Sequence, residues 1–320
     1  MINNEQKIWH DSIVELKKEH EKIANIIGGR RVAFLDIPAY FNVGDFLIYK
    51  GTEQFFNNHN IDVCYRCDCH NYSIKKIAKA DVIVFQGGGN FGDLYSDHQR
   101  FREKVIGLFP NKVIIILPQT VHFSNKDNLN NCIARIGNHS SLYFFARDNK
   151  SYDIAKNITD RVMLCPDMAY SLEFLVDASE VGPSNVKPRR IMNMCRVDIE
   201  NNGQTSSVKK QGFDWEDMIT KTDRLYLKIY RLARRFPWLR ERAQKIWINI
   251  MEDIIFRGVK HFYIHDIIHT DRLHGMILGT LLGKPIVMRD NSYGKNSGFS
   301  ECWLKKYPYF EGKNTNNSAD

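Results

Sequence analysis

Short apolar segments of strand length alternate with helical segments along the first half of the chain. We expect strands at residues 31–37, 61–65, 81–85, 112–118, 141–146 and 161–167. Continuous apolar strands are typical of a parallel sheet that is buried on both faces, and the segments between them can hold right-handed crossover helices. The alternation therefore predicts an α/β lobe with a doubly wound parallel sheet, in which ligands bind at the carboxyl ends of the strands.

The same pattern returns in the second half of the chain. A polar, proline-containing segment at 178–189 indicates a linker. We then expect strands at 189–195, within 259–270 and at 284–290, with a helix over 272–283 between the last two. The chain is therefore predicted to fold as two doubly wound α/β lobes, and the cleft between two lobes is the default binding site.

Expected domain limits follow from this pattern. The N-terminal lobe covers residues 1–180, and the C-terminal lobe covers 188–311 with a basic insertion near 205–250. Apolar residues recur at helical spacing from Asn4 to Ile26, which predicts an amphipathic helix. The polar segment 312–320 is expected to be disordered, because it has too few apolar residues to bury.

The positive charge of the chain is concentrated in one segment. The net charge is +8, and residues 221–245 hold nine basic and two acidic residues, an excess of seven. Such a local excess argues against a general nucleic-acid-binding protein. Apolar and aromatic residues are interleaved with the basic ones, and Pro237 interrupts the segment. Two interpretations stay open: a surface that contacts anionic lipid headgroups, or a charged helical pair that covers the second lobe.

Two further features bear on location and on metal binding. No apolar run is long enough for a membrane span, and no signal-peptide core is present, so we expect a cytoplasmic protein that is at most peripheral at the inner face of the membrane. The odd number of cysteines, seven, argues against a disulfide framework. Cys64, Cys67, Cys69 and His70 are clustered, but no second ligand pair stands at zinc-finger spacing, so we expect neither a metal nor a cofactor.

Two polar segments directly follow strands of the first lobe. Residues 40–45 (YFNVGD) come after the first strand, where Gly44 would allow a tight turn and Asp45 could cap a helix. Residues 86–93 (QGGGNFGD) come after the third strand, and their glycines would let the backbone approach a ligand closely. The second segment is neither a Walker A loop nor a dinucleotide fingerprint. Each segment is either a substrate loop or a turn.

The densest polar segment is HDIIHTDRLHG at residues 265–275. Thr270 and Asp271 are good helix caps, so Arg272 and His274 are expected in the first helical turn. Free N–H groups at a helix start, a guanidinium and an imidazole together would form an anion site. The alternative is that Asp271 and Arg272 form a structural pair and that His274 packs in the core.

Two more basic residues follow strands of the second lobe. Arg196 comes directly after the strand at 189–195, and Lys295 follows the strand at 284–290. Both are expected at the same end of the sheet as the HTDRLHG segment, since carboxyl ends of parallel strands share one edge. The alternative for both is an ordinary charged residue at a solvated strand end or loop.

Taken in this order, the segments resemble the polysaccharide pyruvyl transferase family. The matching blocks cover most of residues 31–305 and are FNVGDFLI, VFQGGGNFGDLYSDHQRFR, ILPQTVHF, FFARDNKSY, CPDMA, CRVDIE, HTDRLHG and DNSYGKNSGF. The resemblance implies two Rossmann-like lobes, similar to the GT-B glycosyltransferase architecture. It implies phosphoenolpyruvate as donor co-substrate. The implied acceptor is a sugar of a surface polysaccharide, such as a capsule, or of a precursor such as an undecaprenyl-diphosphate-linked oligosaccharide.

The resemblance also implies roles for individual residues. The donor would be bound by Arg196, Arg272, Leu273, His274 and Lys295. The acceptor would be bound by Asn42, Gly44, Asp45, Gly88, Gly89, Asn90, Asp93 and His98. Catalysis would fall to Asp271, Arg272 and His274, and His274 either protonates the donor or binds its phosphate.

Two other functions fit parts of the sequence. One is a nucleotide-sugar-dependent glycosyltransferase on the same architecture. The other is a non-catalytic, membrane-associated assembly protein that uses residues 221–245. The HTDRLHG segment argues against the second function, because a scaffold has no need of an anion pocket.

Overall fold

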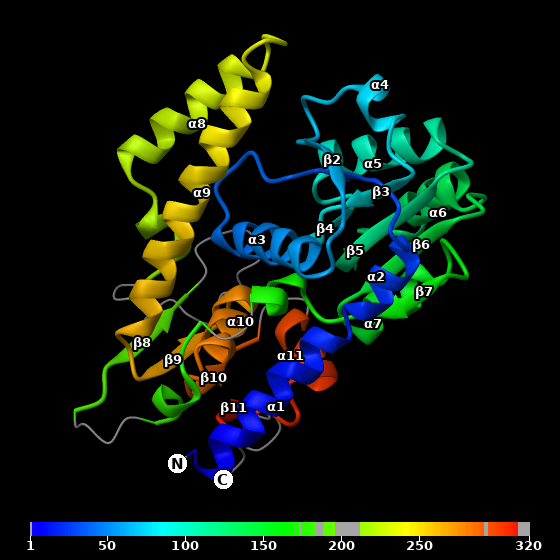
Figure 1. Ribbon diagram of the computed structural model, residues 1–320. Coiled ribbons are helices and arrows are strands. Elements are labelled where there is room, and N and C mark those ends of the chain that lie inside the picture. Colours follow the sequence, from blue (N-terminus) through cyan, green and yellow to red (C-terminus); the bar gives the residue numbers. More distant parts are fainter. Residues whose placement is uncertain (1, 173–174, 184–187, 196–211, 291–293, 313–320) are drawn as a thin grey trace.

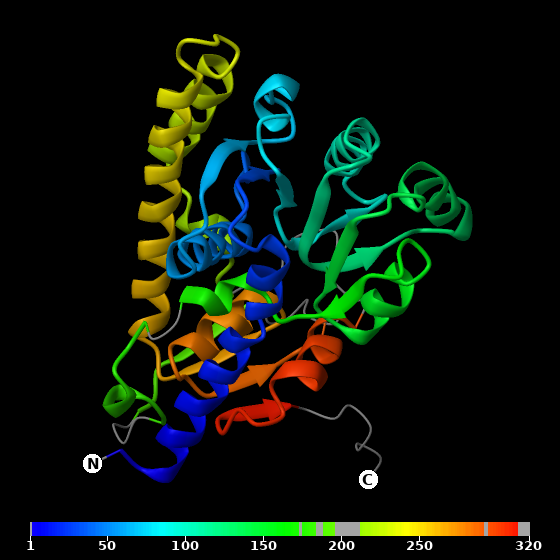
Figure 2. The same cartoon turned by 45° about the vertical axis from the view of Figure 1, so that its right-hand side comes forward.

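Two parallel sheets organise the computed structural model, which describes residues 2–172, 175–183, 188–195, 212–290 and 294–312 (Figures 1 and 2). The first sheet contains β1 (Val32–Leu35), β2 (Val63–Cys67), β3 (Val82–Phe85), β4 (Gly88–Gly92), β5 (Val113–His122), β6 (Leu142–Ala146) and β7 (Val162–Leu164). The second contains β8 (Ile191–Met194), β9 (Ile267–Thr270), β10 (Ile286–Met288) and β11 (Phe310–Gly312). The predicted α/β fold with two lobes is confirmed.

The first sheet has the strand order of a doubly wound fold. Its strands run β2-β1-β3-β5-β6-β7, and all its strand pairs are parallel. Chain order reverses between β1 and β3, which creates a crevice at the carboxyl ends of these two strands. All residues of β1 and β3 are buried, as a strand covered on both faces requires. The fold therefore places Asp36 and Ile37, which follow β1, at the usual ligand position.

Helices cover this sheet and connect its strands. They are α2 (Glu21–Ile27), α3 (Val43–Asn58), α4 (Ile74–Ile77), α5 (Ser96–Leu108), α6 (Lys126–Ile136) and α7 (Asn149–Ala155), followed by the 3-10 helix η1 (Met168–Leu172). The first helix, α1 (Asn4–Lys18), and the 3-10 helix η2 (Ala178–Glu180) pack on the second lobe instead (Figure 2). The single helix predicted from Asn4 to Ile26 is two helices, broken near His20. That side chain is fully buried against Ser171 and Pro166, so the break serves packing.

The glycine-rich segment after β3 is a strand, not the predicted loop. β4 pairs with the second half of β5, beyond the part of β5 that pairs with β3. A Cβ on Gly92 would lie 1.7 Å from the carbonyl oxygen of His122, and the φ of Gly92 is 122°. Only glycine fits this approach, so the glycines let β4 run close to β5.

In the second sheet the four strands follow chain order, β8-β9-β10-β11, and all pairs are parallel. Its helical elements are η4 (Trp215–Met218), α8 (Lys221–Ala233), α9 (Arg240–Tyr263), α10 (Leu273–Leu281) and α11 (Lys295–Trp303). The strand expected within 259–270 is shorter than that range, because α9 continues to Tyr263 and β9 begins at Ile267. The apolar residues before β9 belong to a helix face that packs on Trp215.

Helices α8 and α9 form a hairpin that reaches from the second sheet to the first lobe (Figure 1, yellow-green and yellow). Tyr230 of α8 and Arg234, which directly follows α8, bond to the carboxylate of Asp68 at 2.7 and 2.8 Å. The hairpin therefore covers more than the second lobe. Part of the predicted basic insertion, residues 205–211, lies outside the described residues, as does the predicted disordered tail beyond Gly312.

Three tryptophan side chains join parts of the molecule that are far apart in sequence. The indole N–H of Trp9 donates to the carbonyl of Thr280 at 2.8 Å, and that of Trp303 donates to Arg147 at 2.7 Å. The indole N–H of Trp247 in α9 donates to the carbonyl of Pro38, just after β1, at 2.8 Å. The bonds of Trp303 and Trp247 cross between the lobes and help to fix their spacing, whereas the bond of Trp9 holds α1 against α10 of the second lobe.

Among the described residues, no helix is both long enough and apolar enough to cross a bilayer.

Candidate functional site

A cavity of about 650 Å³ lies between the lobes, where the ends of β1 and β3 face the start of α10. The predicted site residues that line it are Asn42, Asp45, Gly89, Asn90, His98, Arg272, Leu273 and His274. The other lining residues are Ile37, Ala39, Tyr40, Phe41, Cys69, His70, Tyr95, Asp214, Trp215, Glu216 and Arg231. Both lobes therefore contribute side chains to one space, and Arg272 and His274 are open to it.

The start of α10 points into this cavity. Arg272 itself is the N-cap, with extended backbone, and no side chain caps the helix. The predicted caps Thr270 and Asp271 are wrong: Thr270 accepts a hydrogen bond from the N–H of Arg272 at 3.0 Å, one residue before the helix. Asp271 is buried and does not line the cavity. The first N–H groups of α10 thus have no side-chain acceptor from the cap, which favours an anion there.

The guanidinium of Arg272 faces Asp214, a residue just before η4. Its Nε and NH2 donate to the two carboxylate oxygens of Asp214 at 2.9 and 2.5 Å, and both side chains are largely buried. This pair balances the charge of Arg272, so the start of α10 is less positive than the sequence indicates. An incoming anion must share the guanidinium with Asp214 or displace that carboxylate.

His274 spans the gap between the lobes. Its Nε2 lies 3.4 Å from the carboxylate of Asp167, which follows β7 in the first lobe, and Asp167 also pairs with Arg147 at 2.5 Å. Burial acts to raise the pKa of Asp167, but His274 and Arg147 outweigh it and hold that pKa well below its usual range. Asp167 therefore stays ionised beside the imidazole, in a contact that is close enough for an ion pair but does not have hydrogen-bond geometry.

Gly44 explains how the imidazole fits. A Cβ on Gly44 would lie 2.2 Å from Nδ1 of His274 and 2.5 Å from its Cγ. Gly44 is the second residue of α3, so the helix of one lobe makes room for His274 of the other. The structure thus places Gly44 behind His274, outside the residues that line the cavity.

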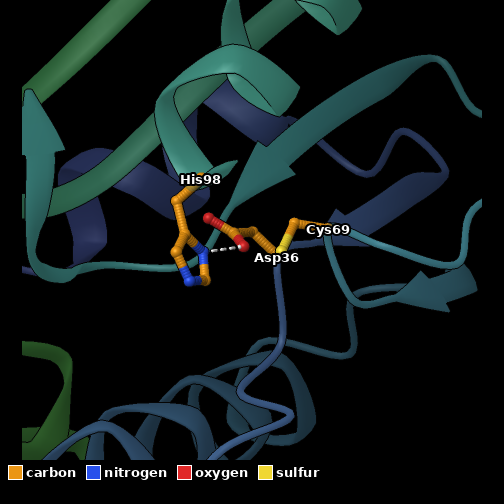
Figure 3. Close-up of side chains that lie close together, drawn as sticks. All are labelled: Asp36, Cys69 and His98. Atoms are coloured by element: carbon orange, nitrogen blue, oxygen red, sulfur yellow. Dashed lines mark hydrogen bonds and ion pairs between the residues drawn. The ribbon is translucent and has the colours of Figure 1, made fainter. Parts of the chain in front are cut away.

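On the opposite wall, His98 is held by a second carboxylate (Figure 3). Nδ1 of His98 lies 2.6 Å from Oδ1 of Asp36, and the other oxygen of Asp36 pairs with Arg102 at 2.6 Å. Asp36 and Arg102 are fully buried, whereas the His98 side chain is 13% exposed and lines the cavity. Asp36 accepts from Nδ1, so Nε2 of His98 is the nitrogen left for a ligand.

Asp36, Cys69 and His98 are close enough together to suggest a metal site, with ligand atoms within 4.8 Å of one another (Figure 3). Their other contacts favour a hydrogen-bonded arrangement. The Asp36 carboxylate is already shared by His98 and Arg102, and a guanidinium repels a cation. Burial raises the pKa of Cys69, so its thiol keeps the proton that a metal ligand must lose.

The rest of the first-lobe wall is ordered by hydrogen bonds. Asn42, not Asp45 as predicted, caps α3, because its Oδ1 accepts from the N–H of Gly44 at 3.0 Å. Asp45 instead accepts from the hydroxyl of Tyr40 at 3.0 Å. Asn90 is fixed by Arg102, which donates to its carbonyl at 2.9 Å and to its side chain at 2.6 Å. Arg102 therefore orients both Asn90 and the Asp36–His98 pair.

Besides Gly44 and Asp271, four further predicted residues lie away from the cavity or outside the described part of the chain. Gly88 is packed beside Asp45, and Asp93 accepts hydrogen bonds from Ser124 and Asn128 at the start of α6. Arg196 lies outside the described residues. Lys295 begins α11, and its side chain lies outside the described part of the structure.

Comparison with known proteins adds one decisive observation: a family model described as polysaccharide pyruvyl transferase matches residues 42–293. The chain belongs to the polysaccharide pyruvyl transferase family. It is 35% identical over 305 residues to a Bacillus subtilis protein named "Putative pyruvyl transferase EpsO", covering 93% of each chain. It is 28% identical to Pyruvyl transferase 1 of Schizosaccharomyces pombe, over 87% of this chain and 70% of that protein.

A solved structure supports the same fold for this pyruvyl transferase family member. A functionally uncharacterised protein from Klebsiella pneumoniae superimposes with a TM-score of 0.59 and 23% identity, covering 93% of this chain and 97% of that one. At this identity the likeness concerns the fold alone.

Several residues in or behind the cavity wall of this family member were missed from the sequence. Asp36 has a φ of 69°, which is uncommon outside glycine, but a sequence carries no mark of such a conformation. Asp167 and Asp214 become site residues only through contacts made across the lobes. Tyr40 lies in the segment 40–45, which was selected from the sequence as a possible substrate loop. A polar hydroxyl in that segment was a usable signal for a site residue.

Proposed function

We propose that this protein transfers the pyruvyl group of phosphoenolpyruvate to two hydroxyls of one sugar, forming a pyruvate ketal on a surface polysaccharide or its lipid-linked precursor. One observation carries the proposal: two histidines, each beside a buried carboxylate and each mounted on a different lobe, line one cavity that also holds the start of α10. The family membership supports the same reaction. No metal or cofactor is needed for it, and phosphoenolpyruvate is a co-substrate.

The donor is assigned to the α10 side of the cavity. Phosphoenolpyruvate carries a phosphate and a carboxylate, and the start of α10 offers backbone N–H groups beside the Arg272 guanidinium. Arg196 and Lys295 follow strands of the same sheet and are proposed as further donor ligands. Asp214 would then lower the affinity for the donor, because it competes with the donor for Arg272.

The reaction requires acid and base catalysis in one place. Protonation of the methylene carbon makes the adjacent carbon electrophilic, and a sugar hydroxyl adds to it and loses its proton. The bond from that carbon to the phosphate oxygen then breaks, and the second hydroxyl adds and loses its proton. Of the two hydroxyl protons, one replaces the proton given to the methylene carbon and the other leaves on inorganic phosphate, so the protons balance.

The two histidines suit these two tasks. His274, beside Arg272 at the donor end, is proposed to protonate the methylene carbon, with Asp167 holding the imidazolium. His98, beside Asn90 and Asn42 on the first-lobe wall, is proposed to accept the hydroxyl proton at Nε2, because Asp36 fixes its other nitrogen. Asn42, Asp45, Gly89 and Asn90 would then bind the acceptor sugar.

The test is mass spectrometry of a candidate oligosaccharide after incubation with the purified protein and phosphoenolpyruvate. The expected product gains one ketal-linked pyruvyl group, and one inorganic phosphate is released per ketal. The His274→Gln variant is the control and should release no phosphate above background.

The outcome against the proposal is equally clear. If phosphoenolpyruvate neither binds nor reacts, while a UDP- or GDP-sugar stabilises the protein and is consumed, the chain is a glycosyltransferase of the same architecture. If neither donor binds, the cavity has no donor role and the assembly-protein interpretation is favoured.

A further inference from the structure

The outer face of α8 and the turn after it expose apolar side chains to solvent. Leu225, Ile229 and Leu232 are 57%, 50% and 59% exposed, and their spacing places them in one stripe along the helix. In the turn, Trp238 is 76% exposed and its ring lies against Phe236. Clustered apolar groups of this exposure mark a contact surface rather than chance. We name these five residues the apolar stripe.

Basic side chains run beside the apolar stripe. Lys221 and Lys228 are two helical turns apart on the same side of α8, and Arg235 follows after a further two turns' spacing. All three are exposed. The segment 221–245 carries an excess of seven positive charges. The hairpin thus joins an apolar strip to a row of cations, the pattern of a helix that lies in a membrane interface.

A groove of about 310 Å³ between α8 and α9 adjoins the apolar stripe. It is lined by Tyr226, Ile229, Tyr230, Ala233, Leu239, Arg242, Ala243, Ile246 and Trp247. Ile229 belongs to both the stripe and the groove. The lining is mostly apolar, so contact with hydrocarbon is more favourable in this groove than contact with water.

We propose that this face of the hairpin docks on the anionic surface of a lipid bilayer. Anionic headgroups would neutralise the row of cations, and Trp238 and Phe236 would enter the interface, where aromatic rings are favoured. A second copy of the chain fits less well. A symmetric dimer through this face would place two segments with the same positive excess against each other.

The same helix borders the proposed catalytic cavity. Arg231, on another side of α8, lines the cavity and donates to the carbonyl of Ala39 at 3.0 Å. Docking of the outer face would therefore hold the cavity about one helix diameter, roughly 10 Å, from the bilayer, where a lipid-linked sugar is presented. This consequence rests on the proposed function, but the docking itself does not.

Vesicle flotation tests the docking with the full chain. Wild-type protein should float with equimolar phosphatidylglycerol and phosphatidylcholine vesicles, bind pure phosphatidylcholine vesicles weakly, and lose binding as salt rises. The combined change Lys221→Gln, Lys228→Gln and Arg235→Gln should lower the partition constant about 100-fold. The control is the combined change of three exposed first-lobe lysines, Lys126→Gln, Lys150→Gln and Lys156→Gln, which removes the same net charge.

A second variant tests the apolar contribution. Leu225→Gln, Ile229→Gln and Leu232→Gln together should lower the partition constant at least about tenfold, whereas Leu108→Gln, a half-exposed leucine at the end of α5, should not. Ketal formation on a soluble acceptor should be unchanged in every variant, which separates docking from the proposed reaction. Wild type that ignores anionic vesicles, or basic-row variants that bind like the control, would overturn the docking. So would light scattering that shows a dimer broken by the apolar substitutions.

Discussion

The two histidines that face the cavity are held in different ways. His98, Asp36 and Arg102 all belong to the first lobe, within the segment from the end of β1 to α5. His274 belongs to the second lobe, whereas its carboxylate partner Asp167 belongs to the first. The first pair is complete within one lobe, and the second exists only when the lobes are apposed.

Because of this difference, the proposed acid, His274, depends on the relative position of the lobes, and the proposed base, His98, does not. The contact of His98 with Asp36 is a short hydrogen bond at 2.6 Å, while His274 Nε2 lies 3.4 Å from Asp167. A small movement of the lobes would change the His274 pair and leave the His98 pair intact. We therefore expect perturbations at the lobe boundary to affect donor protonation first.

The largest effect is expected for the histidine that spans the lobes. His274→Gln removes the proposed proton donor to the methylene carbon, and kcat should fall about 1,000-fold. Phosphate release from phosphoenolpyruvate in the presence of acceptor measures this loss. A variant that folds normally and retains kcat within about twofold would remove His274 from the acid role.

A third histidine, His20, limits the pH range in which the protein is stable enough to compare the His274 and His98 pairs. Burial of His20 lowers its pKa from 6.5 to about 4. In the unfolded chain His20 takes up its proton near pH 6.5 and in the folded chain only near pH 4, so stability falls as pH drops through this interval, by about 3 kcal/mol.

Chemical denaturation at a series of pH values checks this loss. His20→Gln should flatten the slope between pH 6.5 and 4, because the titrating group is gone. An unchanged slope in that variant would assign the acid instability to other groups.

The pair within the first lobe should give a smaller catalytic loss. His98→Gln keeps the Asp36–Arg102 ion pair and should lower kcat about 100-fold, because the proposed proton acceptor is gone. Asp36→Asn should have a similar effect on kcat, because an amide carries no charge to stabilise a protonated His98, and its N–H can donate to Nδ1 and favour the wrong tautomer. A double variant no worse than either single one would show that the two residues act as a unit.

Asp36→Asn also leaves buried Arg102 without its carboxylate, so its stability must be measured in parallel. If His98→Gln raised only KM and left kcat unchanged, His98 would bind the acceptor without accepting a proton.

The smallest effect is expected at the boundary between the lobes. Gly44→Ala places a Cβ 2.2 Å from Nδ1 of His274, so the ring must turn away, and kcat should fall about tenfold. Gly107→Ala in α5 is the matched control, because a Cβ there meets nothing within 4 Å. Equal activity of the two variants would mean that the position of the His274 ring does not affect kcat.

The fold was largely predictable from the sequence, because apolar strands and their spacing are local features. β1, β3 and the first half of β5 consist of continuous apolar residues, and these strands were found within a few residues of their limits. The pattern failed where a tertiary contact decided the conformation. The glycine-rich residues 88–92 form a strand because β5 is long enough to pair with them. Residues 259–263 stay helical because α9 packs on Trp215.

The candidate site was predictable only in part, for the same reason. Arg272 and His274 stand out as polar residues at a strand end, and both line the cavity. Their partners Asp214 and Asp167 lie 58 and 107 positions away in sequence and meet them only through the packing of the lobes. Sequence also overestimated the positive charge at α10, because the carboxylate that balances Arg272 comes from another segment.

The two indole bonds between the lobes, from Trp303 and Trp247, end on main-chain carbonyls, at Arg147 and Pro38. A carbonyl is present whatever side chain the residue carries, so the distance between the lobes does not depend on the identity of those acceptors. Side chains on the wall near His98 can therefore be exchanged without moving α10. On the proposed function, the wall for the acceptor sugar could change in this way while the wall for the donor stays in place.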